Sequence, residues 1–172
     1  MGLDVGKVFF IADLHLNHET IIKSASRPFS SVEEMNETII QNWNRVVKDG
    51  DKVYILGDVG FFYPLTKENT MEVIQRLNGY KFLVMGNHDM YRKPQWWRDV
   101  GFNEVSQYPI LFAKHYILSH EPIHPRPVSP YVNIHGHKHR GKMRSKQYIN
   151  VSAECIDFTP ISFHAIQKIK AR

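Results

Sequence analysis

The sequence predicts an α/β fold in which two mixed β-sheets pack together and are flanked by helices. In the first hundred residues, short and continuous apolar runs alternate with segments that have helical amphipathic spacing. This alternation predicts a strand–helix–strand–helix–strand unit with a parallel sheet. After residue 100 the pattern changes to several short strand-like runs with tight connections. They predict a second sheet that is at least partly antiparallel.

Three apolar runs predict the strands of the first sheet. They are "KVFFIAD" at 7–13, "DKVYILGD" at 51–58 and "YKFLVMGNHD" at 80–89. Continuous apolar runs of this length are typical of strands that are buried on both faces.

Two longer segments predict the helices between these strands. In "FSSVEEMNETIIQNWNRVV", at 29–47, Ser30 or Ser31 can cap the helix and acidic residues follow in the first turn. Its apolar stripe is formed by Met35, Ile39, Trp43 and Val46. The second helix is "LTKENTMEVIQRL", at 65–77, which ends at Asn78-Gly79. A short helix is expected at "WWRDVGF", 96–102.

The strand-like runs after residue 100 predict the second sheet. They are "YPILFA", "HYILSH", "YVNIHG", "QYINVS" and "ISFHAI".

Composition is that of an ordinary globular protein, and we expect one domain over residues 1–172. The net charge of +5 weakly favours anionic partners such as phosphates or nucleic acid. A lone cysteine, Cys155, excludes an internal disulfide and a zinc site built from cysteines, and it suits a reducing cytoplasm. The apolar run "VFFIA" is too short to span a membrane, so we expect a cytoplasmic protein without membrane contact.

Polar clusters follow the predicted strands at their carboxyl ends. They are Asp13-Leu-His15, Gly57-Asp58, Gly86-Asn87-His88-Asp89, Ser119-His120 and Gly136-His137-Lys-His139. Ligands of open α/β sheets bind beyond the carboxyl ends of the strands, so these clusters are expected to converge on one crevice. Within each of the pairs 13/15 and 137/139, an extended chain would direct both side chains to one face.

The chemistry of these clusters indicates metal binding. Carboxylate oxygen and imidazole nitrogen without thiolate suit Mn, Fe, Zn or Ni better than a structural zinc site. Seven ligands are too many for one tetrahedral ion but suit two ions that share a bridging carboxylate. Two divalent ions would leave residual positive charge beside Asp13 and Asp58, which favours an anionic substrate such as a phosphate.

These five clusters, in this order, resemble the calcineurin-like metallophosphoesterase superfamily. The resemblance covers roughly residues 8–165, and the N-terminal part is similar to a small bacterial and phage-type branch. It implies a four-layer αββα sandwich.

The resemblance also implies a role for each residue. Asp13, His15 and His139 would hold one metal, Asn87, His120 and His137 the other, and Asp58 would bridge the two. His88 would not be a ligand; it would protonate the leaving oxygen or stabilise the phosphoryl group. The nucleophile would be a metal-bridging hydroxide. The two divalent ions would be Mn²⁺ in the first place, with Fe, Zn, Ni, Co or Mg as alternatives.

Other polar residues have weaker claims to the site. His18 and Arg126 are candidate substrate-binding residues, although His18 could equally begin a helix or support a ligand. His135 precedes the family's motif, so we expect it either to lie in the core or to support a ligand. The basic run from Lys138 to Lys146 is either a solvated surface or an electropositive rim for phosphate-rich substrates.

We therefore expect a dinuclear phosphoesterase, with phosphodiesters favoured over monoesters and nucleotides or nucleic acid among the candidate substrates. Protein phosphatases of the superfamily extend the second cluster to GDxVDRG, whereas this chain reads "GDVGFF", which argues against that activity. One alternative is a catalytically silent metal-binding scaffold for protein or nucleic-acid partners. Another is a nucleic-acid-binding protein whose metals are structural. The oligomeric state is not predicted.

Overall fold

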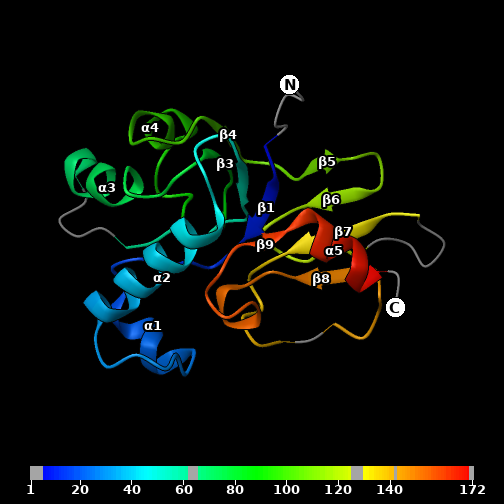
Figure 1. Ribbon diagram of the computed structural model, residues 1–172, viewed down its shortest axis with the longest axis horizontal. Coiled ribbons are helices and arrows are strands. Elements are labelled where there is room, and N and C mark those ends of the chain that lie inside the picture. Colours follow the sequence, from blue (N-terminus) through cyan, green and yellow to red (C-terminus); the bar gives the residue numbers. More distant parts are fainter. Residues whose placement is uncertain (1–5, 62–65, 125–129, 142, 171–172) are drawn as a thin grey trace.

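The computed structural model describes residues 6–61, 66–124, 130–141 and 143–170, which form two β-sheets and their helices (Figure 1). The first sheet has the order β4-β3-β2-β1-β9. Its parallel strands are β1 (Val8–Ile11), β2 (Lys52–Ile55), β3 (Tyr80–Val84) and β4 (Glu104–Ser106), and β9 (Ile161–Ser162) runs antiparallel to β1. The second sheet comprises β5 (Ile110–Phe112), β6 (Tyr116–Leu118), β7 (Val132–His135) and β8 (Tyr148–Asn150). Only β5 is antiparallel to its neighbour there, so both sheets are mixed, as predicted.

The helices are α1 (Glu19–Ser24), α2 (Val32–Val46), α3 (Lys67–Ile74), α4 (Pro94–Asp99) and α5 (Phe163–Lys170), with a 3₁₀ turn at Ala153–Cys155. The start of α2 is fixed by Ser31, whose hydroxyl accepts the backbone N–H of Glu34 at 3.2 Å. Met35, Ile39 and Trp43 are fully buried, which confirms the predicted apolar stripe.

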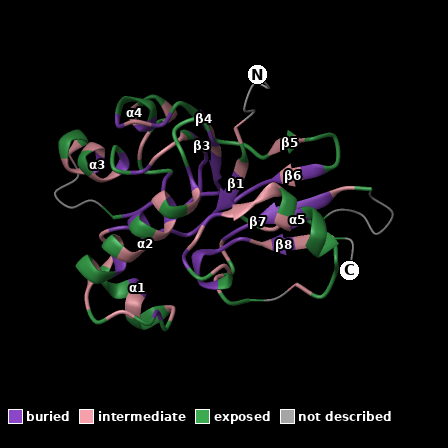
Figure 2. Cartoon of the chain, viewed as in Figure 1, coloured by how far each residue is buried: buried purple, intermediate pink, exposed green. Residues whose placement is uncertain are grey.

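Two apolar layers hold the fold together. Helices α2, α3 and α4 pack against one face of the first sheet, where Trp43, Ile74 and Trp97 are fully buried. The second layer lies between the sheets and includes Phe10 of β1 and Ile134 of β7. Figure 2 shows this arrangement, with buried strands in the centre and exposed outer turns on the helices. The predicted class of two mixed sheets flanked by helices is confirmed.

The prediction for "ISFHAI" was wrong, because only Ile161 and Ser162 form a strand and they join the first sheet. From Phe163 onward the chain is helical, and Ile166 turns into the layer between the sheets. Phe163 and Ile166 are three residues apart, a spacing that suits one face of a helix. Helix α1 and strand β4 were not predicted, and α3 ends three residues earlier than expected.

Strand register brings the carboxyl ends of the strands together. Ile11 pairs with Ile55, which in turn pairs with Leu83, so β1, β2 and β3 end side by side. In the second sheet, Leu118 pairs with Ile134, which places the residues after β6 beside those after β7. Ala12 connects the two sheets: its N–H donates to Val151 at 2.9 Å and its carbonyl accepts from Ala153 at 2.9 Å.

Candidate metal centre

The two loops that follow β1 and β2 are bonded to each other through their backbones. The N–H of Asp13 donates to the carbonyl of Gly57, and the N–H of His15 donates to the carbonyl of Asp58, both at 3.0 Å. These bonds extend the strand pairing beyond the regular sheet. They hold the side chains of three predicted ligands at one edge.

The backbone at the predicted ligands is left-handed rather than extended. Five of the seven have positive φ, from 44° to 66°, namely Asp13, His15, Asp58, His137 and His139. The prediction that the pairs 13/15 and 137/139 share a face because the chain is extended was therefore wrong. The side chains do meet, but they do so in a conformation that non-glycine residues adopt at a cost.

One group of side chains gathers around Asp13. Ligand atoms of Asp13, His15 and His139 all lie within 4.8 Å of one another, and the same is true of Asp13, Asp58 and His120. The Oδ2 atom of Asp58 lies 3.5 Å from Nε2 of His15 and 3.4 Å from Nε2 of His120. Asp58 thus stands between the two halves of the cluster, as the resemblance implies.

The second group consists of Asn87, His120 and His137. Nε2 of His120 lies 2.9 Å from Oδ1 of Asn87 and 3.1 Å from Nδ1 of His137, and the last two atoms are 3.1 Å apart. The backbone N–H of His137 also donates to both carboxylate oxygens of Asp13, at 3.1 and 2.9 Å. All seven predicted ligands therefore lie in one continuous cluster.

The donor atoms of the cluster suit divalent cations. Nδ1 of His120 lies 2.9 Å from the carbonyl of Leu56. Because a carbonyl accepts, Nδ1–H donates, and in this tautomer the lone pair of Nε2 faces Oδ1 of Asn87 and Oδ2 of Asp58. Nε2 of His15 is buried without a hydrogen-bond partner. Lone pairs that converge in this way repel unless a cation lies among them, so the residues fit the implied metals.

Burial sets the protonation of this cluster. It lowers the pKa of His15 to about 2, with the nearby charge of Arg27 acting in the same direction. His15 is therefore a neutral imidazole, the form that binds metal. Burial also raises the pKa of Asp13, while His120 opposes that shift. A carboxylate that is costly to ionise in isolation is stabilised by a cation beside it.

Two further residues support the cluster, and sequence analysis missed both. Nδ1 of His139 donates to Oε1 of Glu154 at 3.0 Å, and Nε of Arg27 donates to the same oxygen at 2.8 Å. Arg27 also donates to the carbonyls of Asp13 at 2.6 Å and Leu14 at 2.8 Å. The pair therefore orients one predicted ligand and fixes the left-handed loop that carries two others. The only sequence feature that could have pointed to these two residues is that each is an isolated charge, Arg27 in "SASRPFS" and Glu154 in "VSAECI".

Asp89 joins the loops after β2 and β3. Its Oδ2 accepts the backbone N–H groups of Asp58 and Gly86, both at 2.8 Å, and its Oδ1 accepts that of Val59 at 3.0 Å. Burial raises the pKa of Asp89 to about 6, although these three donors oppose the shift. The side chain thus fixes the backbone around Asp58 and is itself fully buried.

His88 and His18 lie beside the cluster. The ring of His88 is exposed and packs edge-on against His15, with centroids 5.4 Å apart. The backbone N–H of His88 donates to Oδ1 of Asp58 at 3.0 Å. His18 precedes α1 as its N-terminal cap residue; Nδ1 lies 3.2 Å from Nδ1 of His15 and Nε2 lies 2.9 Å from the hydroxyl of Thr20. Both ring nitrogens of His18 therefore have partners, and one of them is a predicted ligand.

Comparison with known protein families identifies the family of the chain that carries this cluster. The model of the calcineurin-like phosphoesterase family matches residues 6–158. The chain belongs to this family. The phosphoesterase match covers every predicted ligand, and it confirms the resemblance at the level of the family.

Proteins of unknown function are among those similar to this calcineurin-like phosphoesterase. An uncharacterised protein of Methanocaldococcus jannaschii is 35% identical in an alignment of 179 positions, which covers 97% of this chain and 93% of that protein. The Gene 66 protein of Mycobacterium phage L5 is 31% identical over 85 residues, 49% of this chain and 41% of the phage protein. The crystal structure of a protein of unknown function from Aquifex aeolicus has a TM-score of 0.73 and 27% identity, and the match covers 95% of this chain and 99% of that one.

The remaining predicted residues lie outside the metal cluster of this phosphoesterase, or outside the described residues. Arg126 and Lys142 are among the residues that the structure does not describe. His135 is fully buried, and its Nδ1 lies 2.8 Å from the carbonyl of Gly136. In the basic run, Lys138, Arg140 and Arg144 are exposed, and Arg140 donates to the carbonyl of Ser26 at 3.1 Å. Exposure is compatible with both a solvated surface and an electropositive rim, so the two interpretations of this run stay predictions.

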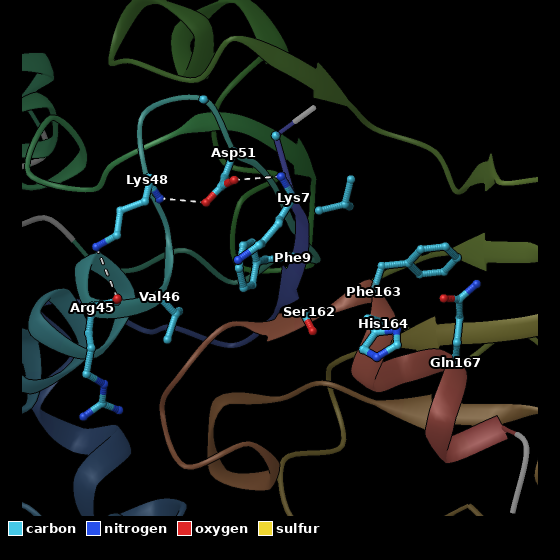
Figure 3. A pocket seen from close by; sticks show the side chains of 13 residues that line it. Lys7, Phe9, Arg45, Val46, Lys48, Asp51, Ser162, Phe163, His164 and Gln167 are labelled. Carbon is cyan, nitrogen blue, oxygen red and sulfur yellow. Dashed lines mark hydrogen bonds between the residues drawn. The ribbon is translucent and has the colours of Figure 1, made fainter. Parts of the chain in front are cut away.

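A large cavity of the phosphoesterase domain lies at the other end of its first sheet (Figure 3). Its volume is about 960 Å³, and its lining includes Lys7, Lys48 and Asp51, which precede β1 and β2. The carboxylate of Asp51 accepts the backbone N–H groups of Lys7 at 2.7 Å and Lys48 at 2.8 Å. None of the predicted ligands lines this cavity.

Across the described helices, none has the length and apolar character that crossing a membrane requires.

Proposed function

We propose that the chain is a dinuclear metal-dependent phosphoesterase that hydrolyses phosphoester bonds, with phosphodiesters favoured over monoesters. The observation that carries this proposal is the converging lone pairs of Asn87, His120 and Asp58, which stand beside the exposed ring of His88. Such a cluster attracts cations, and the cations in turn attract an anionic phosphate. Membership of the calcineurin-like phosphoesterase family supports the same class of reaction.

Each half of the cluster would hold one ion. Asp13, His15 and His139 would bind the first, and Asn87, His120 and His137 the second, with Asp58 bridging them. Mn²⁺ is the first choice for these oxygen and nitrogen ligands, and Fe, Zn, Ni, Co and Mg are the alternatives. When bound, two ions would lower the pKa of a water molecule and neutralise charge on the phosphoryl oxygens.

His88 would deliver a proton to the leaving oxygen or stabilise the phosphoryl group. Its backbone bond to the Asp58 carboxylate fixes its position relative to the proposed bridging ligand. Its ring remains exposed, so it can reach a substrate that lies over the ions. A histidine acid is most useful when the leaving group is an alkoxide, which phosphodiesters and phosphomonoesters of alcohols both release. Nucleotides or nucleic acid remain candidate substrates, and the cytoplasm is the location we propose.

Replacing His88 with asparagine tests this function. We expect His88→Asn to keep about two Mn²⁺ per chain and to lower turnover of benzyl methyl phosphate, whose leaving group is an alkoxide, by a factor of about 10²–10⁴. His164→Asn is the matched control, because His164 is exposed on α5 and lies outside the cluster. Metal content is measured by elemental analysis and turnover by chromatography of the released alcohol. A His88→Asn variant with the turnover of the unaltered chain would refute the proposed role.

A further inference from the structure

A small cavity opens beside the proposed reaction centre. Its volume is about 190 Å³, and its lining comprises His15, His18, Gly60, Phe61, Asn87, His88 and Tyr91. A cavity of about 150 Å³ is enough to hold benzene, so this one has room for a single six-membered ring.

The cavity lies where the leaving group of a bound substrate would be placed. It touches His15, a proposed ligand of one ion, and Asn87, a proposed ligand of the other. A phosphate that contacts both ions therefore lies at the mouth of this cavity. His88 lines the same wall, so the oxygen that receives its proton must lie on this side of the phosphorus.

Most of the residues that line the cavity carry aromatic or imidazole rings. Phe61 is 52% exposed and Tyr91 is 41% exposed, so both rings leave surface that a ligand can contact. The rings of His18 and Phe61 lie 5.7 Å apart with a tilt of 35°, and those of His18 and His88 lie 6.2 Å apart. Aromatic rings at such separations attract a further aromatic ring beyond the gain from apolar contact alone.

The polar groups of His18, Phe61 and Tyr91 are already engaged. The hydroxyl of Tyr91 donates to the carbonyl of Gly60 at 3.4 Å, and the N–H of Phe61 donates to the carbonyl of Leu16 at 2.7 Å. Both ring nitrogens of His18 have partners, as described above. Along the wall formed by His18, Phe61 and Tyr91, a guest would therefore be recognised by the shape and the π-face of its ring rather than by hydrogen bonds along its edge.

We infer that this cavity is a subsite for an aromatic ring on the leaving alcohol. The substrate would then be a phosphodiester of an alcohol that carries an aromatic ring. A nucleoside is the biological example of such an alcohol. The inference rests on the proposed phosphoesterase function. Recognition through a ring face tolerates different bases, because every nucleobase presents one.

Two matched substrates test this inference with the Mn²⁺-loaded full chain. Benzyl methyl phosphate and cyclohexylmethyl methyl phosphate both release a primary alcohol with a six-membered ring, and only the first ring is aromatic. We expect kcat/KM to be about tenfold higher for the benzyl ester, as one stacking contact provides. In Phe61→Leu this ratio should fall towards one, whereas Phe61→Trp should keep it. The matched control is Tyr108→Leu, an exposed aromatic residue that does not line the cavity, and it should keep the ratio as well.

Equal kcat/KM for the two esters in the unaltered chain would overturn the inference, and so would a benzyl preference that survives Phe61→Leu. Hydrolysis of dimethyl phosphate separates these results from a failure of the proposed function, because that substrate has no ring. If none of the three esters is hydrolysed, the affinities of the chain for benzylphosphonate and for cyclohexylmethylphosphonate are compared by calorimetry to test the subsite alone. Tighter binding of the aromatic compound that Phe61→Leu abolishes supports the subsite, and equal binding overturns it.

Discussion

Arg27 and Glu154 form a fully buried ion pair, in which Nη2 of the arginine lies 2.8 Å from Oε1 of the glutamate. The residues are 127 positions apart in the chain. Burial acts to raise the pKa of Glu154, but the hydrogen bond from His139 and the charge of Arg27 outweigh it, so that the pKa lies below its ordinary value. The ionised carboxylate is therefore available to orient His139.

Removing the charge of Glu154 should weaken metal binding. In Glu154→Gln, the neutral amide holds His139 less strongly, and we expect the affinity for Mn²⁺ at one site to fall by a factor of about 10–100. The variant also leaves the Arg27 charge buried without its partner, which costs stability, up to about 3–5 kcal/mol. Calorimetric titration with Mn²⁺, after circular dichroism has confirmed folding, measures the first effect.

The matched control is Glu37→Gln, which removes a similar charge from an ion pair with Arg76. That pair is about half exposed, so its loss should change stability by less than about 1 kcal/mol and leave Mn²⁺ affinity unchanged. Wild-type Mn²⁺ affinity in folded Glu154→Gln would show that Glu154 does not position His139.

Asp89 should be needed for the fold around the site. An asparagine at this position can accept at one atom only, whereas Asp89 accepts three N–H groups through both of its oxygens. We expect Asp89→Asn to lose about 1–3 kcal/mol in the free energy of unfolding, because a buried donor is left unsatisfied. Urea denaturation measures this loss. Asp49→Asn changes an exposed aspartate and should have little effect; equal stability of the two variants would contradict the role of Asp89.

Sequence reasoning predicted that the seven candidate ligands would lie together, as they do, and it predicted the details of the fold less well. Each ligand cluster follows a strand whose apolar run is unambiguous, and parallel strands end at a common edge. The strand β4 and the helix α1 were missed because they are only 3 and 6 residues long and carry little periodic signal. The last helix was mistaken for a strand because Ile161–Ser162 begins as one.

Long-range pairing explains why the supporting residues were missed. The bonds of Arg27 to Glu154 and of His139 to Glu154 depend on how the two sheets meet at Ala12, which no local pattern encodes. The left-handed backbone at Asp13 and His137 is equally non-local, because tertiary bonds to Gly57 and Asp13 stabilise it.

Gly136 should not tolerate a side chain. A Cβ atom there would lie 2.5 Å from Oδ2 of Asp13, well inside contact distance. We expect Gly136→Ala to displace this carboxylate, to lower Mn²⁺ affinity and to cost about 1–3 kcal/mol of stability through overpacking. In the control Gly50→Ala, the added Cβ meets nothing within 4 Å. Mn²⁺ titration and thermal unfolding compare the two; a Gly136→Ala variant that binds Mn²⁺ like Gly50→Ala would disprove the close approach.

Metal binding should stabilise the folded chain. The cluster brings Asp13 and Asp58 close together with lone pairs of His15 and His120, and the unfolded chain cannot maintain this arrangement. At an Mn²⁺ concentration of about 100 times the dissociation constant, each site should add about 2.7 kcal/mol to the free energy of unfolding. Removing metal with EDTA should reverse the gain, and Asp58→Asn should abolish most of it, because the proposed bridge serves both ions. Thermal unfolding with and without Mn²⁺ measures the effect. Identical unfolding curves under the two conditions would mean that the converging side chains do not form a metal centre.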